Sequence, residues 1–300
     1  MQVLEIFIDG LGLGMNDPLV NPVVAAKTPF LDTILHGHNL WGKNEIHTTQ
    51  VLLKPLEATL GVPGVPQSAT GQTTLWTGVN AAQLEGRHIN AYPTTTLQKV
   101  IAEHSLFKQL KDQGYKVTFA NAFSPMYFEL VTQGKRKHAT STLSTLAAGV
   151  ELRSLTDLRQ GKAVYQDITN HFLDEFEGGF PVYSPQQAGL NLANLAAEYD
   201  FTLFEYFQTD LCGHKQELSS SIAIIERIDS FLSAVAANVN NNTLILVTSD
   251  HGNVEDITLK GHTTNPVPLL LIGDYARTPY ASVASIGDLA AFVVKVATNV

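Results

Sequence analysis

Short runs of β-branched and aromatic residues alternate along the chain with longer amphipathic stretches. The runs at 2–8, 115–120, 201–207 and 243–248 predict β-strands, because each is short, mainly apolar and followed by polar residues. Strands that alternate with helical patterns are typical of parallel sheets. The pattern therefore predicts an α/β fold with a mainly parallel central sheet.

Three amphipathic segments, residues 97–114, 222–239 and 285–298, predict helices that cover the faces of this sheet. The region around 130–190 is less regular and predicts a small insertion beside the core. The sequence contains no internal repeat and no Pro/Gly/Ser-rich linker that divides it. Residues 1–300 are therefore expected to form a single domain that includes this insertion.

Composition limits the partners and the location of the protein. A net charge of −9 leaves no extended basic face for nucleic acid. The apolar runs are shorter than the roughly 20 residues that cross a bilayer, so no membrane contact is expected. The N-terminus has no basic leader, and the single cysteine, Cys212, cannot form an internal disulfide, so a cytoplasmic location is expected. The oligomeric state does not follow from the sequence.

Aspartate and histidine residues follow the predicted strands. Asp9 comes directly after the first strand, Asp210 and His214 follow the third, and Asp250 and His251 follow the fourth. In open α/β sheets, ligands bind beyond the carboxyl ends of the strands. We therefore expect these side chains to form one shared site.

The residue types in this set are metal ligands. In the SDHGN segment at 249–253, an aspartate oxygen and an imidazole nitrogen suit Zn or Mn better than Ca. Asp210 and His214 are four residues apart, which places them on one face of a helical turn. His262, in GHTTNPVP, adds another imidazole. Each feature alone also fits an ordinary turn, a surface hydrogen bond or a solvated loop, but together they predict two divalent metal ions, Mn or Zn with Mg possible.

A hydroxyl nucleophile is expected in PQSATGQTTLWTG at 66–78, where a turn leads into a predicted helix. A helix N-terminus stabilises an oxyanion, and a nearby metal favours loss of the hydroxyl proton. Ser68 and Thr70 are the two candidates. The alternative is that one of these hydroxyls only caps the helix.

The glycines of FIDGLGLG at 7–14 first suggest a dinucleotide-binding loop. That fingerprint needs glycine at its first, third and sixth positions, and Gly10 and Gly12 fit, but the sixth position is Met15. A nucleotide-dependent oxidoreductase is therefore disfavoured. The glycines are instead expected to let the backbone turn beside Asp9.

These segments, together with NPVVAAKTPFLD, SLFKQLKDQGYKV and SIGDLAAF, resemble the alkaline-phosphatase superfamily in their order along the chain. The resemblance is strongest to the branch that contains cofactor-independent phosphoglycerate mutase and phosphopentomutase. It implies a three-layer α/β/α sandwich. It also implies two metal sites, the first formed by Asp9, Thr70, Asp250 and His251 and the second by Asp210, His214 and His262.

The same resemblance implies that Thr70 is the nucleophile, since Gly78 follows it at the family's spacing, with Ser68 as the alternative. The expected function is a metal-dependent phosphohydrolase, a phosphatase or phosphodiesterase, that acts on a small phosphorylated substrate through a phosphothreonine intermediate. Hydrolysis is preferred to mutase transfer because the chain between Arg87 and Asp210 is too short for a full cap domain that excludes water.

Several alternatives and secondary residues remain open. Arg87 and His88 are candidates for holding the rest of an anionic substrate, whereas the basic group at 135–137 fits a solvated loop better. A phosphomutase and a non-catalytic metal- or ligand-binding protein that kept the fold are the alternative functions. A sulfatase is disfavoured because the only cysteine lies inside DLCGH.

Overall fold

The protein is described by a computed structural model that covers residues 1–38, 40–43, 45–173, 179–275 and 278–298. The strands are β1 (Gln2–Ile8), β2 (Ile46–His47), β3 (Val51–Leu56), β4 (Val117–Phe119), β5 (Ala122–Phe123), β6 (Arg153–Ser154), β7 (Phe201–Tyr206), β8 (Thr243–Thr248) and β9 (Val267–Ile272). The helices are α1 (Pro22–Ala25), α2 (Pro29–Ile34), α3 (Ser68–Thr77), α4 (Ala81–Glu85), α5 (Thr95–His104), α6 (Leu106–Lys111), α7 (Pro125–Thr132), α8 (Thr140–Ala147), α9 (Leu155–Arg159), α11 (Pro185–Ala196), α12 (Gln208–Lys215), α13 (Leu218–Asn238) and α14 (Leu289–Thr298).

Seven strands form the central sheet in the order β2-β3-β9-β8-β1-β7-β4. β1 lies between β7 and β8 and is parallel to both, and β4 is parallel to β7. β9 runs antiparallel to β8 and to β3, and β2 runs antiparallel to β3. The predicted α/β class is confirmed, with reversed strands on one side of the parallel centre.

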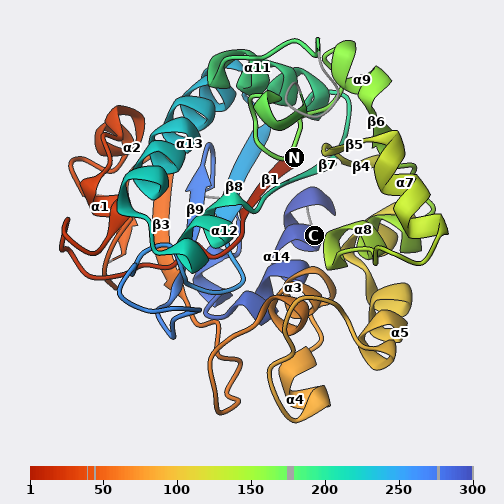
Figure 1. The fold of residues 1–300 in the computed structure, drawn as a ribbon, viewed down its shortest axis with the longest axis horizontal. Coiled ribbons are helices and arrows are strands. Elements are labelled where there is room, and N and C mark those ends of the chain that lie inside the picture. Colours follow the sequence, from red (N-terminus) through yellow and green to blue (C-terminus); the bar gives the residue numbers. More distant parts are fainter. Residues whose placement is uncertain (39, 44, 174–178, 276–277, 299–300) are drawn as a thin grey trace.

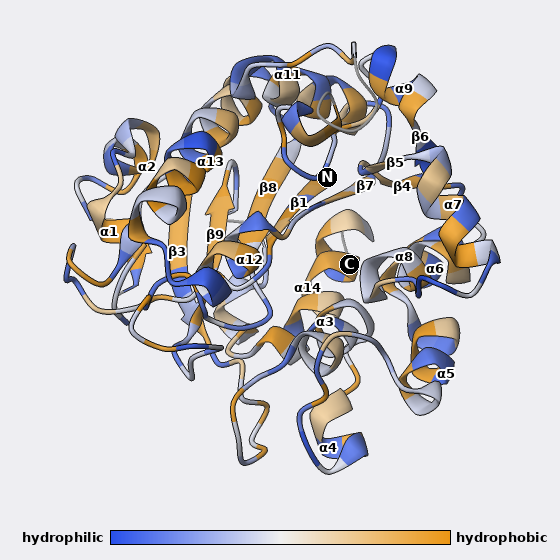
Figure 2. Ribbon diagram, in the orientation of Figure 1, coloured by the Kyte–Doolittle hydropathy of each residue, from blue (hydrophilic) through white to orange (hydrophobic). Residues whose placement is uncertain are grey.

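Helices cover both faces of the sheet (Figure 1). One buried cluster lies between the sheet and α11, α13, α1 and α2, and the other lies between the sheet and α3, α6 and α14. The strands are mainly apolar, whereas the helices at the outside carry polar residues (Figure 2). Buried apolar side chains on both faces therefore hold the sheet, whose carboxyl edge carries the polar loops.

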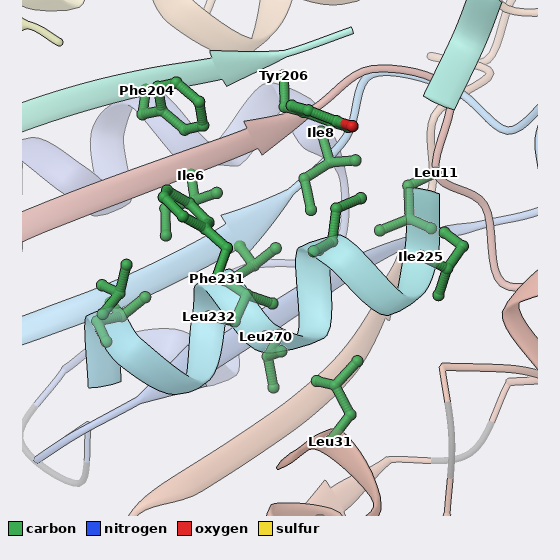
Figure 3. Close-up of a cluster of buried hydrophobic side chains, with 14 of the residues drawn as sticks. Ile6, Ile8, Leu11, Leu31, Phe204, Tyr206, Ile225, Phe231, Leu232 and Leu270 are labelled. Carbon is green, nitrogen blue, oxygen red and sulfur yellow. The ribbon is translucent and has the colours of Figure 1, made fainter. Parts of the chain in front are cut away.

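Helix α13 packs its apolar side chains on one face of the sheet. Phe231 of α13 lies with its ring centroid 5.3 Å from that of Phe204 in β7. Figure 3 shows Phe231 and Leu232 of the helix among side chains of the strands, including Ile6 and Leu270. Burying such side chains contributes roughly 1.5–3 kcal/mol each. This packing fixes the strands from which the loops of the site extend.

The predicted helix at 97–114 is wrong in its continuity. The structure has two helices, α5 and α6, with Ser105 between them in a non-helical conformation (φ −50°, ψ 132°). The Ser105 hydroxyl donates a hydrogen bond to the Ser144 carbonyl, 2.6 Å away in α8. This tertiary contact replaces the helical continuation that local periodicity favours.

The region predicted as an insertion contains the end of α7, α8, α9 and β6, and β6 forms a separate two-stranded sheet with β5, which precedes the region. α8 packs on α5, α6 and α3 and so belongs to the outer layer of the core. The single-domain organisation stays a prediction. None of the described helices is both long and apolar enough to span a membrane.

Candidate metal centre

The predicted ligands come together at the carboxyl edge of the sheet. Asp9 follows β1, and Asp250 and His251 follow β8. Asp210 and His214 lie on α12, directly after β7. Because β1 lies between β7 and β8, residues from distant parts of the chain meet here.

The first ligand group consists of Asp9, Asp250 and His251, which are all buried. Nε2 of His251 lies 3.4 Å from Oδ1 of Asp9 and 3.5 Å from Oδ2 of Asp250. One ligand atom from each of these residues lies within 4.8 Å of the others. Two carboxylates and an imidazole at such distances can share one cation.

The second ligand group consists of Asp210, His251 and His262, and its ligand atoms also lie within 4.8 Å of one another. Nε2 of His262 lies 3.5 Å from Oδ1 of Asp210. Nε2 of His214 lies 3.3 Å from the other oxygen, Oδ2. His251 therefore belongs to both groups. Asp210 lies beside the imidazoles of His214 and His262.

The hydrogen bonding of these buried groups fits a bound cation. Oδ1 of Asp9, both carboxylate oxygens of Asp250 and Nδ1 of His251 have no hydrogen-bond partner among the described residues. Buried polar atoms are normally paired, and buried charge is costly unless it is compensated. Divalent cations would satisfy carboxylate oxygens that the protein leaves unpaired.

Burial and like charge shift the pKa values in this centre. Burial, reinforced by the charge of Asp210, raises the pKa of Asp250 to about 8. The pKa of Asp9 is raised well above its usual range by burial and by the charge of Asp250. Burial lowers the pKa of His251 well below its usual value and also lowers that of His262. Neutral imidazoles are the form that binds metals, whereas the adjacent carboxylates need a cation beside them.

The orientation of His262 is fixed by its other ring nitrogen. Nδ1 donates a hydrogen bond to the carbonyl of Pro66 at 2.8 Å. The ring stacks on that of His251, with centroids 3.6 Å apart. A histidine whose Nδ1 donates to a carbonyl presents the lone pair of Nε2, so His262 is oriented as a ligand.

Ser68 and Thr70 occupy different environments at the start of α3. Oγ of Ser68 lies 3.0 Å from Nε2 of His251, inside the ligand group. The Thr70 hydroxyl donates to the Gln67 carbonyl at 3.1 Å and accepts from the Ile89 backbone N–H at 3.2 Å. The alternative that either hydroxyl caps the helix is wrong, because the N-cap residue is Gln67. Of the two, Ser68 is the hydroxyl that faces the ligands.

Sequence reasoning missed Glu255, a buried carboxylate two residues after the SDHGN segment. Its Oε2 accepts from the backbone N–H groups of Gly12 (3.0 Å) and Asn253 (2.7 Å). Its Oε1 accepts from the Thr263 hydroxyl and, at 3.0 Å, from the Asn265 amide. One carboxylate thus joins the loops after β1 and β8 and the loop that carries His262. No local sequence pattern reveals this, because the donors come from three separate segments.

Close contact with Glu255 also explains the glycines near Asp9. A Cβ added to Gly12 would lie 2.3 Å from Oε1 of Glu255, and one added to Gly252 would lie 2.2 Å from the same atom. Any side chain at these positions would displace the carboxylate. The glycines of FIDGLGLG therefore make room for Glu255, as well as allowing the turn at Gly10 (φ +69°).

Arg87 and His88, the basic residues predicted to contact substrate, directly precede Ile89, whose backbone bonds to Ala69 and Thr70 at the start of α3. Nε2 of His88 donates to the carbonyl of Val62 at 3.2 Å, which ties together two loops. The side chain of Arg87 is exposed, as are Lys135, Arg136 and Lys137. A substrate-binding role for Arg87 and His88 stays a prediction.

Comparison with known proteins places this centre in a family context. The model of the metalloenzyme superfamily matches residues 184–298, which contain Asp210, His214, Asp250, His251 and His262. A curated relative, 2,3-bisphosphoglycerate-independent phosphoglycerate mutase of Desulforudis audaxviator, is 36% identical over 106 residues, or 33% of this chain and 21% of that protein. The enzyme of the same name from Pyrococcus abyssi is 30% identical over 114 residues, or 34% and 27%. The matched stretch spans only a fifth to about a quarter of these relatives.

Solved structures share the fold over the whole chain. The PH0037 protein from Pyrococcus horikoshii aligns with a TM-score of 0.60 and 15% identity, covering 100% of this chain and 97% of that one. Leishmania mexicana phosphoglycerate mutase aligns with a TM-score of 0.53 and 12% identity, covering 99% and 95%. At these identities the likeness concerns the fold. The resemblance inferred from the motifs is confirmed over residues 184–298 by the family model, and the solved structures confirm the fold.

Proposed function

We propose that this chain catalyses phosphoryl transfer from a small phosphate ester, using two divalent metal ions, since residues 184–298 match the metalloenzyme superfamily and the fold is shared with a phosphoglycerate mutase. The observation that carries the proposal is the position of Ser68. Its hydroxyl, in the first turn of α3, lies 3.0 Å from Nε2 of His251, beside carboxylate oxygens without hydrogen-bond partners among the described residues.

The residues divide between two metal positions. Asp9, Asp250, His251 and the Ser68 hydroxyl would hold one ion, and Asp210, His214 and His262 would hold the other. This assignment keeps the expected ligand sets except that Ser68 takes the place of Thr70. Thr70 is engaged with Gln67 and Ile89, whereas Ser68 faces the ligands. Bound divalent ions would lower the pKa of the hydroxyl and offset the negative charge of the phosphoryl oxygens.

The nucleophile in this mechanism is Ser68. Its Oγ forms a bond to phosphorus while the ester P–O bond breaks, and the alcohol leaves with a proton. The N-terminus of α3 favours the negative charge at this position. A phosphoserine intermediate results, which replaces the expected phosphothreonine. A water molecule or a second hydroxyl then accepts the phosphoryl group and restores Ser68.

The acceptor distinguishes a hydrolase from a mutase. The expected preference for hydrolysis rests only on the short chain between Arg87 and Asp210, and the matched relatives do not support it, since they are named as mutases. The mutase therefore stands as a second candidate with its own supporting observation. Both candidates use the same phosphoserine.

Turnover of aryl phosphates tests the proposal. The protein would be loaded with Mn²⁺ or Zn²⁺, assayed for metal by elemental analysis and tested on p-nitrophenyl phosphate and bis-p-nitrophenyl phosphate. We expect about two ions per chain and a loss of kcat of at least about 10³-fold in Ser68→Ala. Thr70→Ala is the matched control, and it should keep kcat within about tenfold. A larger loss of kcat in Thr70→Ala than in Ser68→Ala would overturn the assignment of the nucleophile.

The same preparation tests the acceptor. Incubation with 3-phosphoglycerate would release inorganic phosphate if water accepts the phosphoryl group, and would form 2-phosphoglycerate if a second hydroxyl does. No metal uptake under any condition would contradict both candidates.

A further inference from the structure

A cavity of about 120 Å³ lies at the end of β7, between the sheet and the segment after β4. Aromatic rings line its walls, including those of Tyr92, Phe123, Tyr127 and Phe207. Glu205, Arg136 and Lys137 are also among the residues that line it. The cavity therefore combines ring faces, a carboxyl group and two cations.

Two hydrogen bonds join the end of β7, beside this cavity, to the backbone of Asp9 in the first metal-ligand group. The amide of Asp9 donates to the carbonyl of Tyr206 at 2.9 Å, immediately before Phe207. The Thr209 hydroxyl, two residues after Phe207, donates to the carbonyl of Asp9 at 2.6 Å. Neighbouring strands lie about 4.8 Å apart, so the cavity at the end of β7 is next to the ligands at the end of β1. A phosphate ester held by those ligands can extend its organic part into the cavity.

The two cations lie on aromatic rings and are available to an anion. The guanidinium carbon of Arg136 lies 5.2 Å from the ring centroid of Tyr127, and Nζ of Lys137 lies 6.0 Å from that of Tyr92. Tyr127 is itself fixed, because its hydroxyl is 2.7 Å from Nδ1 of His138. Among the residues that the structure describes, no carboxylate forms an ion pair with either cation. The basic group at 135–137 is exposed, in keeping with the expected solvated loop, and Arg136 and Lys137 also line the cavity.

Glu205 supplies an acceptor for hydroxyl groups. Its carboxyl is largely buried and accepts a hydrogen bond from the Ser141 hydroxyl at 2.6 Å. The side chain of Asn121 bonds both the backbone N–H and the carbonyl of Glu205, at 2.8 and 2.7 Å, which fixes the strand end. A carboxyl group next to ring faces suits a polyhydroxylated ring, whose hydroxyls donate and whose C–H faces pack on aromatic side chains.

We propose that this cavity binds the non-reacting part of the substrate, and that this part is a sugar-like ring with a second anionic group held by Arg136 and Lys137. This inference rests on the proposed phosphoryl transfer and names the class of its substrate. The phosphoryl group that reacts lies at the metal ligands. The ring lies against the aromatic walls, and the second anion lies at the rim.

Equilibrium binding tests the inference without turnover. Ser68→Ala protein, with its metal content verified, would be titrated calorimetrically with fructose 1,6-bisphosphate, fructose 6-phosphate, 3-phosphoglycerate and inorganic phosphate. We expect the bisphosphate to bind most tightly. Arg136→Gln and Lys137→Gln should each weaken its binding about tenfold, because each removes a charge-assisted contact, and should leave the binding of inorganic phosphate unchanged.

Two further variants sharpen the result. Lys135→Gln is the matched control, because Lys135 is exposed beside the other two cations but does not line the cavity. Tyr92→Ser removes a partly exposed ring and should weaken the bisphosphate but not inorganic phosphate. The inference is overturned if 3-phosphoglycerate binds as tightly as the bisphosphate. It is also overturned if Lys135→Gln has the same effect as the other two substitutions, or if none of the substitutions changes the affinity for the bisphosphate.

These measurements separate this inference from the proposed function. If the wild-type protein shows no turnover but Arg136→Gln selectively weakens binding of the bisphosphate, the catalytic proposal fails and the binding site stands. If turnover is present and the bisphosphate shows no preference for the wild-type cavity, only the substrate class is wrong.

Discussion

The carboxylate of Glu255 shows how one side chain can set the geometry of ligands that it does not contact. Its four hydrogen bonds come from Gly12, Asn253, Thr263 and Asn265. Asn253 in turn donates to Oδ1 of Asp210 at 2.6 Å. A chain of hydrogen bonds therefore links the loops of both ligand groups to one buried acid.

Glu255→Gln is expected to weaken metal binding by about 10–100-fold, the range typical of losing a group that orients metal ligands. The new amide presents hydrogen atoms to donors that need an acceptor, so at least one loop loses its anchor. Metal affinity would be measured by calorimetry on the metal-free protein, with folding checked by circular dichroism.

Asp256→Asn is the control for this substitution, because the Asp256 carboxylate accepts from the nearby Thr258 and, among the described residues, from no ligand loop. An unchanged metal affinity in a folded Glu255→Gln protein would contradict the role given to Glu255.

Glu5 makes stability depend on pH, away from the metal centre. Its Oε1 accepts from the indole N–H of Trp76 at 2.9 Å, and burial raises its pKa from 4.5 to about 7. Between these two values the folded state binds more protons than the unfolded chain, so this residue's contribution to stability falls as pH rises through this window. The destabilisation caused by ionised Glu5 is complete only above pH 7.

We expect the free energy of unfolding of wild type to fall relative to that of Glu5→Gln by about 3 kcal/mol between pH 4 and pH 8, since one pKa unit corresponds to about 1.4 kcal/mol. Urea unfolding of both proteins across this range measures the difference. The contribution of Glu205, whose pKa is also raised to about 7, is the same in both proteins and cancels in this difference. A difference that is independent of pH would show that Glu5 does not titrate in this range.

Helix α3 must approach the loop after β8 closely to bring Ser68 to His251. Gly71 permits this, since a Cβ there would lie 2.9 Å from Cβ of Asp250 and 3.1 Å from its carbonyl oxygen. In an open helix position, alanine would be more stable than glycine by about 1 kcal/mol. Here the added methyl group would push the helix away from a ligand.

Gly71→Ala is therefore expected to lower both metal affinity and turnover by about tenfold or more, despite its better helix propensity. Gly189→Ala is a matched control, because its Cβ would lie 2.7 Å from Cβ of Ala234, between α11 and α13, neither of which carries a proposed ligand. It should destabilise the fold and leave metal affinity intact. A gain in stability with unchanged metal binding in Gly71→Ala would contradict the close approach.

The central strands could be predicted from the sequence because each is an apolar run with local boundaries, and β1 and β8 have the predicted bounds. The gathering of Asp and His at one edge also followed, since it depends only on parallel strands. The break at Ser105 could not be predicted, because it depends on a contact with α8. The antiparallel pairing of β9 with β3 and β8 is likewise a tertiary choice.

The sequence alone could not decide between Ser68 and Thr70 either. Both hydroxyls lie in the same segment, and only the rotation of α3 decides which one faces His251. The role of Glu255 could not be predicted because its hydrogen-bond partners are spread over more than 250 residues. Local patterns thus give the ligand types, and tertiary packing gives their orientation.

The central claim, phosphoryl transfer through Ser68 at a pair of metal ions, is tested most directly by locating the phosphoryl group. The metal-loaded protein would be mixed with p-nitrophenyl phosphate, quenched with acid within the first turnover, digested and mapped by mass spectrometry. We predict one phosphoryl group on Ser68, absent without metal and absent in Ser68→Ala. A phosphoryl group on Thr70, or turnover without any phosphorylated residue, would contradict the account.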